Sequence, residues 1–324
     1  MVRLWRRHGL SVSVIHSLEL PEDYRSLLHD LGCDTYLLGV KDSVDLVPGI
    51  HRAVVIGVCH TVFLEKSHAL RQLGCRLVWL NLMTSIGATE GLLYEDAPPF
   101  DCYVFESPFQ LAKLSKDLTR YGVHSVQAVL IPGPLEISDW EYAPRPVTAG
   151  GDFVIGKLAR PDIAKWSRRT WDIYGMVDHP RRKALVMGVD KDILGWIGHP
   201  PVWGTVLPPG AIPTRDYYRQ IHCLMPVNFA AFENWPRVGL EAMACGVPIV
   251  APREGGWCDM IIHGETGFLA SSPKEFADYA TALSRDETLR LKIAHQARQR
   301  LVEDLARSDK IWAQWERVFH DLAN

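Results

Sequence analysis

The stretch that decides the fold is Ala231-Phe-Glu-Asn-Trp-Pro-Arg-Val-Gly-Leu-Glu-Ala-Met-Ala-Cys-Gly-Val-Pro-Ile-Val-Ala251. Pro236 is typical of the first turn of a helix, where its missing N–H is not needed. Gly246 is typical of a helix C-cap, and the apolar residues 247–251 predict a short buried strand. Together these signals predict a loop, a helix and a strand in that order, which is common in α/β proteins.

Two carboxylates in this stretch carry the chemistry. Glu233 lies in the predicted loop and Glu241, with seven residues between them, on the side of the predicted helix. A helix start offers free N–H groups and a positive dipole end to an anion, while carboxylates accept hydrogen bonds from hydroxyls. This combination suits a sugar joined to a phosphate. The spacing of the two acids alone also fits a surface helix with solvated acids.

The string that follows Glu241, Ala-Met-Ala-Cys-Gly-Val-Pro-Ile-Val, makes the pattern specific. Here the chain resembles the retaining, nucleotide-sugar-dependent glycosyltransferases of family 4. The resemblance implies the GT-B fold, in which two Rossmann-like domains face a cleft, with the donor mostly on the C-terminal domain and the acceptor mostly on the N-terminal one. It covers residues 153–269 strongly and the earlier part of the chain more weakly.

The resemblance also implies roles for the residues of this stretch. Glu241 is expected to hold the ribose hydroxyls of the donor. Glu233 is expected to hold the sugar, helped by backbone groups near Asn234 and Trp235. Pro236 stands where the family usually has glycine, so one N–H expected to contact the sugar is missing. Family members retain the anomeric configuration without a protein nucleophile and need no metal.

A basic loop follows the predicted strand at residues 153–155 and resembles the loop that supplies cations to the donor diphosphate in this family. Arg160 and Lys165 are the cations expected to stabilise the departing diphosphate, and Lys157, where the family usually has Arg, is a third candidate. A solvated basic loop is the alternative. Further along, Gly255 and Gly256 permit a close backbone approach at another helix start, which suits a phosphate.

The sequence predicts no metal site and no cofactor beyond the nucleotide-diphosphate sugar itself. Asp190-Lys-Asp192 matches an Asp-x-Asp pattern that holds a metal in another glycosyltransferase fold. We interpret Asp190 instead as a helix cap, since the surrounding chain resembles the metal-independent class. No His/Cys spacing indicates zinc.

The first half alternates predicted strands with predicted helices, which indicates a parallel, doubly wound sheet whose ligands lie beyond the strand C-termini. The predicted strands are 12–15, 35–38, 53–58, 76–80, 102–105 and 126–131. Family members open with a strand, a glycine-rich loop and a long helix. Residues 4–9 resemble only the tail of that helix, so we expect the N-terminal domain to lack its first strand-loop-helix unit.

Two polar residues follow strands of the first half. His60 and Asn81 are acceptor-side candidates, although His60 also suits a helix cap and Asn81 cannot act as a base. Between residues 84 and 99 we expect a loop with Glu90, Glu95 and Asp96 solvated, with a contact to the acceptor as the alternative.

The predicted linker is the Pro- and Gly-rich segment 144–151. It divides an acceptor domain at residues 1–148 from a nucleotide-sugar domain at residues 149–307. A helix at residues 308–324 is expected to cross back to the N-terminal domain, with its aromatic residues in the core.

Composition excludes several classes of function. The 324 residues are 47% hydrophobic and 23% charged, with a formal net charge of -3, which does not favour nucleic acid. The seven cysteines are scattered, as expected for a reduced, cytoplasmic protein. No apolar run is long enough to span a membrane, although Arg3, Arg6 and Arg7 would permit a weak contact with a membrane surface.

The sequence therefore predicts an enzyme that transfers a sugar from a nucleotide-diphosphate donor to a sugar, a lipid-linked or a small-molecule acceptor. Another GT-B activity, such as a sugar-nucleotide epimerase or a phosphorylase, is the alternative within enzymes, although no pyridoxal-phosphate lysine motif supports a phosphorylase. A non-catalytic sugar-nucleotide-binding module is the alternative outside them, because of the abbreviated start and Asn81.

Overall fold

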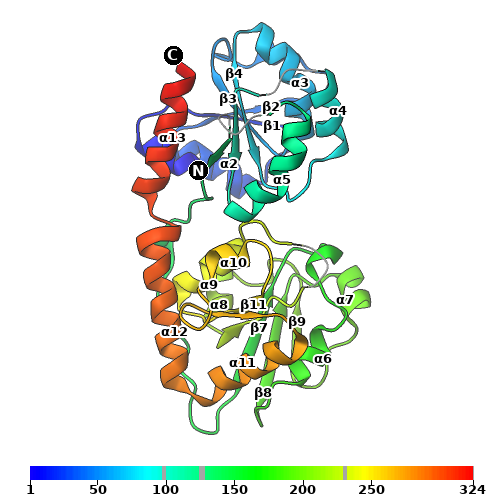
Figure 1. Ribbon diagram of the computed structural model, residues 1–324, viewed down its shortest axis with the longest axis vertical. Helices are drawn as coiled ribbons and strands as arrows, with labels where there is room; N and C mark the ends of the chain where they lie inside the picture. The colour runs from blue at the N-terminus through cyan, green and yellow to red at the C-terminus, as the bar shows by residue number, and fades with distance from the viewer. Residues whose placement is uncertain (97–99, 124–127, 229–231, 324) are drawn as a thin grey trace. The chain divides into compact units, whose positions relative to one another are not determined.

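The computed structural model describes residues 1–96, 100–123, 128–228 and 232–323, which form two compact units (Figure 1). The first unit comprises Met1–Pro134 and Ser308–Asn324, and the second comprises Leu135–Arg307. Ala231, the start of the strand expected at 126–131 and the end of the loop expected at 84–99 lie outside the described residues.

A four-stranded parallel sheet in the order β3-β4-β5-β6 forms the centre of the first unit. Its strands are β3 (Val54–Val58), β4 (Arg76–Asn81), β5 (Cys102–Phe105) and β6 (Ala128–Leu130). The helices of this unit are α1 (Val2–Arg7), α2 (Glu22–Asp30), α3 (Thr61–Gln72), α4 (Ala88–Asp96), α5 (Pro108–Arg120) and α13 (Ser308–Ala323). Every residue of β5 is buried, as expected for a parallel strand covered on both faces.

A separate pair of parallel strands, β1 (Ser13–His16) and β2 (Asp34–Leu37), completes the first unit. Within the described residues this pair forms its own sheet and is not hydrogen-bonded to the four-stranded one. The apolar sequence of β3 is typical of a central parallel strand, yet Val54, Val55 and Ile56 are only half-buried and Val58 is exposed. Strand β3 therefore combines the composition of a central strand with the burial of an edge strand.

Helix α4 corrects the expectation of a loop with solvated acids at residues 84–99. Glu90 is buried on this helix, and its carboxylate accepts hydrogen bonds from Trp79 Nε1 at 2.9 Å and from Tyr94 Oη at 2.7 Å. Burial raises the pKa of the Glu90 carboxyl, and these two donors oppose the shift. Glu90 is therefore part of the core of this unit; nothing is described for the side chains of Glu95 and Asp96.

The second unit is built on a parallel sheet in the order β10-β7-β8-β9. Its strands are β7 (Phe153–Leu158), β8 (Arg182–Met187), β9 (Gly204–Leu207) and β10 (Cys223–Leu224), with the parallel pair β11 (Val250–Pro252) and β12 (Phe268–Ala270) alongside. The helices are α6 (Thr170–Gly175), α7 (Lys191–Ile197), α8 (Thr214–Tyr218), α9 (Arg237–Cys245), α10 (Trp257–Met260), α11 (Pro273–Arg285) and α12 (Glu287–Arg300). A bridge between Leu224 and Ile249 joins the two sets of strands.

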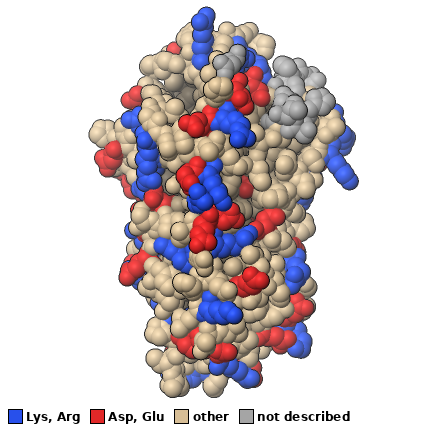
Figure 2. All heavy atoms as spheres, turned by 60° about the vertical axis from the view of Figure 1, so that its left-hand side comes forward, with Lys and Arg blue, Asp and Glu red and all other residues tan. Residues whose placement is uncertain are grey.

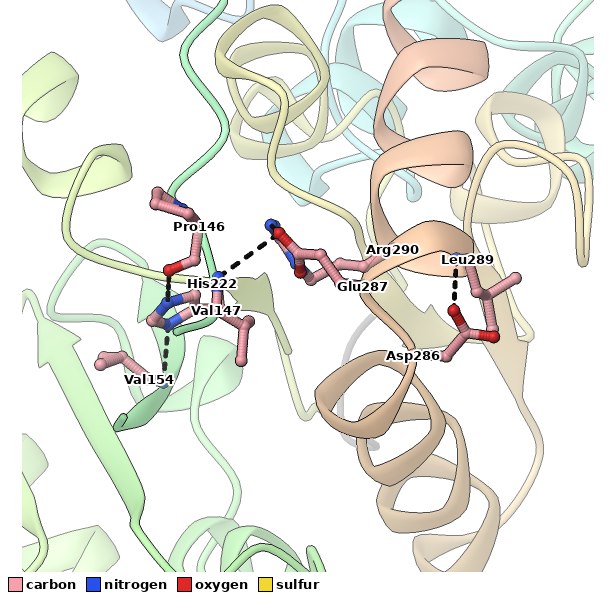
Figure 3. Close-up of polar contacts among 8 residues, drawn as sticks. All are labelled: Pro146, Val147, Val154, His222, Asp286, Glu287, Leu289 and Arg290. Atoms are coloured by element: carbon pink, nitrogen blue, oxygen red, sulfur yellow. Dashed lines mark hydrogen bonds and ion pairs between the residues drawn. The ribbon is translucent and has the colours of Figure 1, made fainter. Parts of the chain in front are cut away.

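The predicted linker lies on the second unit, and the two units divide at Pro134 and Leu135 rather than at residues 148 and 149. Figure 3 shows the contacts that hold it there. His222 Nδ1 accepts the N–H of Val154 at 2.9 Å, so Nε2 carries the hydrogen and donates to the carbonyl of Pro146 at 3.1 Å. Glu287, at the start of α12, accepts the N–H of Val147 at 3.4 Å. These bonds keep the segment on the second unit despite its Pro- and Gly-rich sequence.

The last helix, α13, belongs to the first unit. Trp315 and Val318 are buried against α1, and the rings of Trp5 and Trp315 meet edge to face with their centroids 5.0 Å apart. The aromatic residues of this helix therefore lie in the core, as predicted. On α1, Arg6 donates to the carbonyls of Leu31 and Leu10, so the arginine is occupied within the fold.

The surface carries both signs of charge. On the face shown in Figure 2, Lys and Arg side chains alternate with Asp and Glu side chains, without a broad field of one sign. This face lacks the basic stripe that binding to a nucleic-acid backbone requires. None of the described helices combines the length and the apolar character needed to cross a membrane.

Candidate functional site

A small pocket lies at the carboxyl ends of β7 and β11 in the second unit, where ligands of parallel sheets bind. It encloses about 20 Å³, which is room for about one water molecule. Its walls are formed by Lys157, Leu158, Ala159, Lys165, Pro226, Asn228, Glu233, Val238, Pro252, Glu254 and Trp257. Three of the predicted site residues, Lys157, Lys165 and Glu233, therefore meet here.

An ion pair joins two of these residues. Lys165 Nζ lies 2.7 Å from Glu233 Oε2, and the two side chains are 22% and 24% exposed. Lys165 ends a short 3₁₀ turn that begins at Asp162, whose side chain accepts the N–H of Ala164 at 3.0 Å. This cap fixes the turn and directs Lys165 towards the pocket. In this structure the positive charge of Lys165 is neutralised by the negative charge of Glu233.

Lys157 is fully buried at the base of the pocket. Its ammonium donates to the carbonyl of Val227 at 2.7 Å and lies 5.0 Å from the ring centroid of Trp166. Burial lowers the pKa of Lys157 to about 7, with Glu233 opposing the shift and Lys165 adding to it. Because this pKa lies near neutrality, an anion in the pocket would draw a proton onto Lys157.

Arg160 departs from the expected arrangement. Its side chain is 78% exposed, 3.8 Å from Asp162, and Arg160 is not among the residues that line the pocket. Its backbone carbonyl accepts the indole N–H of Trp166 at 2.8 Å, which orients the loop and leaves the guanidinium in solvent. The expected role of Arg160 beside Lys165 at the diphosphate stays a prediction.

Gly255 and Gly256 lie against the backbone of the loop that carries Glu233. Gly255 has a φ of +60°, and a Cβ there would lie 2.6 Å from the carbonyl oxygen of Glu233. A Cβ on Gly256 would lie 1.6 Å from the carbonyl oxygen of Asn234, and the Gly256 N–H is donated to Glu233 O at 2.8 Å. The glycines thus fasten their loop to the Glu233 loop. The expected phosphate contact of the glycine pair stays a prediction. Trp235 packs against the core of this unit.

Glu241 lies on α9, one turn after Val238, and is not itself among the residues that line the pocket. Its carboxylate accepts a hydrogen bond from Tyr218 Oη at 3.2 Å, and Arg237 Nε lies 3.9 Å away. Burial raises the pKa of Glu241, while Arg237 and Tyr218 oppose the shift. Gly246 is the left-handed C-cap of α9, as the sequence predicts, and Pro236 is its N-cap, one residue before the first turn in which it was expected.

Sequence reasoning missed Glu254 as a pocket residue. It follows the end of β11, is half-buried, and has a pKa that burial raises. Its signal in the sequence is its position directly before the glycine pair, at the point where a predicted buried strand ends.

In the first unit, His60 follows strand β3, and Asn81 is the last residue of the neighbouring strand β4. His60 caps α3, because its Nδ1 accepts the N–H of Val62 at 3.2 Å. Its Nε2 therefore carries the hydrogen and donates to Ser17 Oγ at 2.8 Å. In this arrangement His60 is a hydrogen-bond donor on the solvent side and does not accept a proton from Ser17.

Asn81 is buried, and its Oδ1 accepts the N–H of Met83 at 2.7 Å. Its Nδ2 is a buried donor for which the described residues provide no acceptor. Beside it, Cys59 has a φ of 44°, a strained value for a residue with a side chain. A buried donor without an acceptor and a strained backbone both cost stability, so their presence at this end of the sheet is typical of a functional site.

The Asp-x-Asp motif contributes a helix cap. Asp190 Oδ1 accepts the N–H groups of Asp192 and Ile193 at 3.0 and 2.9 Å, at the start of α7. This confirms the predicted cap. Among the described residues, no group of three or more His, Cys, Asp or Glu is arranged to hold a metal. All seven cysteines are free thiols.

Comparison with known proteins shows that part of this unit is similar to one family. Residues 210–300 match the model of the family described as Glycosyl transferases group 1. This segment contains both carboxylates of the deciding stretch and the glycine pair. It also contains Glu254, but it begins after Lys157 and Lys165, so neither lysine is part of the match.

Curated relatives match over short segments. N-acetyl-alpha-D-glucosaminyl L-malate synthase of Bacillus anthracis is 40% identical over 92 residues, which is 28% of this chain and 24% of the relative. D-inositol 3-phosphate glycosyltransferase of Pseudarthrobacter chlorophenolicus is 35% identical over 96 residues, 29% of this chain and 22% of the relative. The matched segments thus span about a quarter of the length of these relatives.

Solved structures match over nearly the whole chain. Anabaena HepE in complex with UDP-glucose has a TM-score of 0.76 at 16% identity, covering 99% of this chain and 94% of that one. Sucrose-phosphate synthase from Thermosynechococcus elongatus has a TM-score of 0.71 at 16% identity, covering 99% and 91%. These likenesses confirm the predicted α/β class with parallel sheets and the GT-B fold.

Proposed function

We propose that this chain is a retaining glycosyltransferase that moves a sugar from a nucleotide-diphosphate donor to an acceptor without a metal ion. The observation that carries the proposal is the meeting of Lys165 and Glu233 in one pocket of the unit that contains the matched family segment. A cation for phosphate and a carboxylate for sugar hydroxyls are the two groups that a sugar diphosphate requires.

Each residue has a distinct role in this proposal. Lys165 exchanges Glu233 for the diphosphate and stabilises the charge on the leaving group, while Lys157 adds a second positive charge when it is protonated. Glu233, once released, accepts hydrogen bonds from the sugar. Glu241, whose carboxylate is bonded to the Tyr218 hydroxyl, accepts hydrogen bonds from the ribose hydroxyls. The two lysines perform the charge compensation that a metal ion performs in other transferases.

The acceptor is assigned to the first unit. The Nδ2 of Asn81 is an unsatisfied hydrogen-bond donor at the carboxyl end of β4, and the Nε2–H of His60, which here donates to Ser17, lies after the adjacent strand β3. They suit the hydroxyl oxygens of a sugar or another small polar acceptor. The acceptor hydroxyl attacks from the face that the diphosphate leaves, so the protein need not provide a nucleophile.

The test is release of nucleoside diphosphate from a panel of sugar nucleotides, beginning with UDP-glucose, with candidate sugar acceptors in the presence and absence of EDTA. We expect acceptor-dependent release that survives EDTA, and a product whose anomeric configuration, determined by NMR, equals that of the donor. Activity that EDTA abolishes and magnesium restores, or an inverted product, would contradict the mechanism.

A sugar-nucleotide-binding module without transfer is the second candidate. The observation that favours it is the volume of the pocket, about 20 Å³, with the Lys165–Glu233 pair among its walls. Saturable binding of UDP-glucose with no release of UDP under any acceptor would select this function over transfer.

A further inference from the structure

The pocket is lined by two lysines and two glutamates, and only one pair of them forms an ion pair among the described residues. Four ionisable side chains line it, and two of them, Lys165 and Glu233, form an ion pair at 2.7 Å. Lys157 bonds to a backbone carbonyl, and its pKa is about 7. Glu254 forms no ion pair within the described part of the chain. Its negative charge therefore has no direct partner in the pocket.

Glu254 is held in place by the loop that carries it. Its N–H is donated to Pro252 O at 2.8 Å, which turns the chain sharply after β11. The next two residues are the glycines that lie against the Glu233 loop, where the Gly256 N–H bonds to Glu233 O. Glu254 and Glu233 thus stand on two loops that are fastened together.

Donor binding adds the negative charge of the diphosphate to the pocket. In the proposed function the lysines turn to the diphosphate, which leaves both carboxylates for the sugar. A half-buried carboxylate interacts strongly with nearby charge, because water screens it less than at the surface. It accepts hydrogen bonds from hydroxyl groups, attracts an ammonium group and repels another carboxylate.

We propose that Glu254 is a specificity residue that restricts the donor to sugars without negative charge, so that neutral and amine-bearing sugars bind and uronates are excluded. This inference rests on the proposed function, since it requires a nucleotide sugar in this pocket. It goes beyond that function by assigning the charge class of the sugar.

The test is a charge series on one nucleotide. Affinities for UDP-glucuronate, UDP-glucose and UDP-glucosamine are measured by calorimetry at fixed low ionic strength, and each is divided by the affinity of the same variant for UDP. In the wild-type chain we expect glucuronate to bind about tenfold more weakly than glucose, and glucosamine to bind at least as tightly. In Glu254→Gln the series should flatten to within about threefold.

Two controls keep the result specific. Glu265→Gln neutralises an exposed carboxylate in the same unit and should leave the series as in the wild type. Glu254→Asp keeps the charge and should keep the order of the series, which guards against a folding defect in Glu254→Gln. A flat series in the wild type, or a series unchanged in folded Glu254→Gln, would overturn the inference. Absence of UDP binding would overturn the proposed function and this inference with it.

Discussion

Lys165 Nζ lies 2.7 Å from Glu233 Oε2, and both residues line a pocket of about 20 Å³. The space for a ligand is therefore limited by a contact between the two groups that we propose bind it. A diphosphate has to draw Lys165 away before the Glu233 carboxylate is available to a sugar. In the proposed function the pair orders the events, with phosphate recognition first and sugar recognition second.

Replacement of Glu233 by Gln tests this order. The change removes the competing anion from Lys165, so UDP should bind about threefold to tenfold more tightly, which corresponds to the loss of a partly buried ion pair. Turnover of the sugar nucleotide should fall, because the sugar loses its charged acceptor. Calorimetry with UDP and a UDP-release assay measure the two effects. Weaker UDP binding in this variant would show that Glu233 does not compete with the nucleotide.

Replacement of Glu241 by Ala should weaken UDP binding by about 1–3 kcal/mol, the range for a hydrogen bond to a charged group. Tyr218→Phe keeps the carboxylate but removes the hydroxyl that bonds to it at 3.2 Å, so its effect should be smaller. Calorimetry on both variants gives the ranking. Equal affinity of the Glu241→Ala variant and the wild type would remove Glu241 from the nucleotide site.

Lys157 predicts proton uptake on nucleotide binding. Burial lowers its pKa to about 7, so at pH 8 the group is largely neutral in the free chain. A bound diphosphate favours the charged form and raises this pKa, so binding at pH 8 should take up a proton and affinity should fall as the pH rises from 6 to 8. Calorimetry in buffers with different ionisation enthalpies measures the uptake. The Lys157→Met variant should lose it; the same uptake in that variant would assign the proton to another group.

His222 predicts a loss of stability in acid. Burial lowers its pKa to about 4 from the ordinary 6.5. Below pH 6.5 the unfolded chain binds a proton that the folded chain rejects, so the contribution is complete above pH 6.5 and is lost as the pH falls through 4. It amounts to at most about 3 kcal/mol. Urea unfolding of the wild type and of His222→Gln from pH 7 to pH 4 should show a weaker pH dependence in the variant, and parallel curves would exclude this residue as the cause.

Glu90 predicts a large effect from one buried carboxyl group. Glu90→Ala leaves the donors of Trp79 and Tyr94 without their acceptor, and each orphaned donor costs about 1–3 kcal/mol. Glu90→Gln keeps an acceptor oxygen and should cost less. Chemical denaturation of the two variants, with an exposed substitution such as Glu22→Ala as control, measures the difference. A cost for Glu90→Ala no larger than that of the control would contradict the buried network.

The fold was predictable because its signals are local. Apolar runs bounded by glycine and proline place the strands of the first half to within about two residues, as for β5 at Cys102–Phe105. The run at 247–251 is less accurate, because β11 begins three residues later, at Val250. The caps of α9 follow from Pro236 and Gly246, which fix the backbone by their own covalent structure. Parallel sheets follow from the alternation of strands and helices.

The site was predictable only in part, because burial and pairing depend on residues far apart in the sequence. Lys165 and Glu233 are 68 residues apart, and only the fold brings them within 2.7 Å. Arg160 and Lys165 belong to one loop, yet they lie on either side of the turn that Asp162 caps. The Arg160 side chain is exposed, whereas Lys165 lines the pocket. The burial of Glu90 required Trp79 on a neighbouring strand. The packing of the glycine pair against the backbone of Glu233 and Asn234 could not be predicted, because these residues are about twenty positions away in the sequence.

The unpaired sides of β1 and β3 bear on how the purified chain behaves in solution. Within the described residues neither strand is hydrogen-bonded to a further strand on that side, and apolar side chains such as Ile15, which is 37% exposed, and Val58, which is 46% exposed, lie on these strands. Open edges of this kind are templates for pairing with another chain. The protein should therefore self-associate as its concentration rises, through β-strand contacts that mild denaturant weakens, and a lysine placed at Val58 should keep it monomeric.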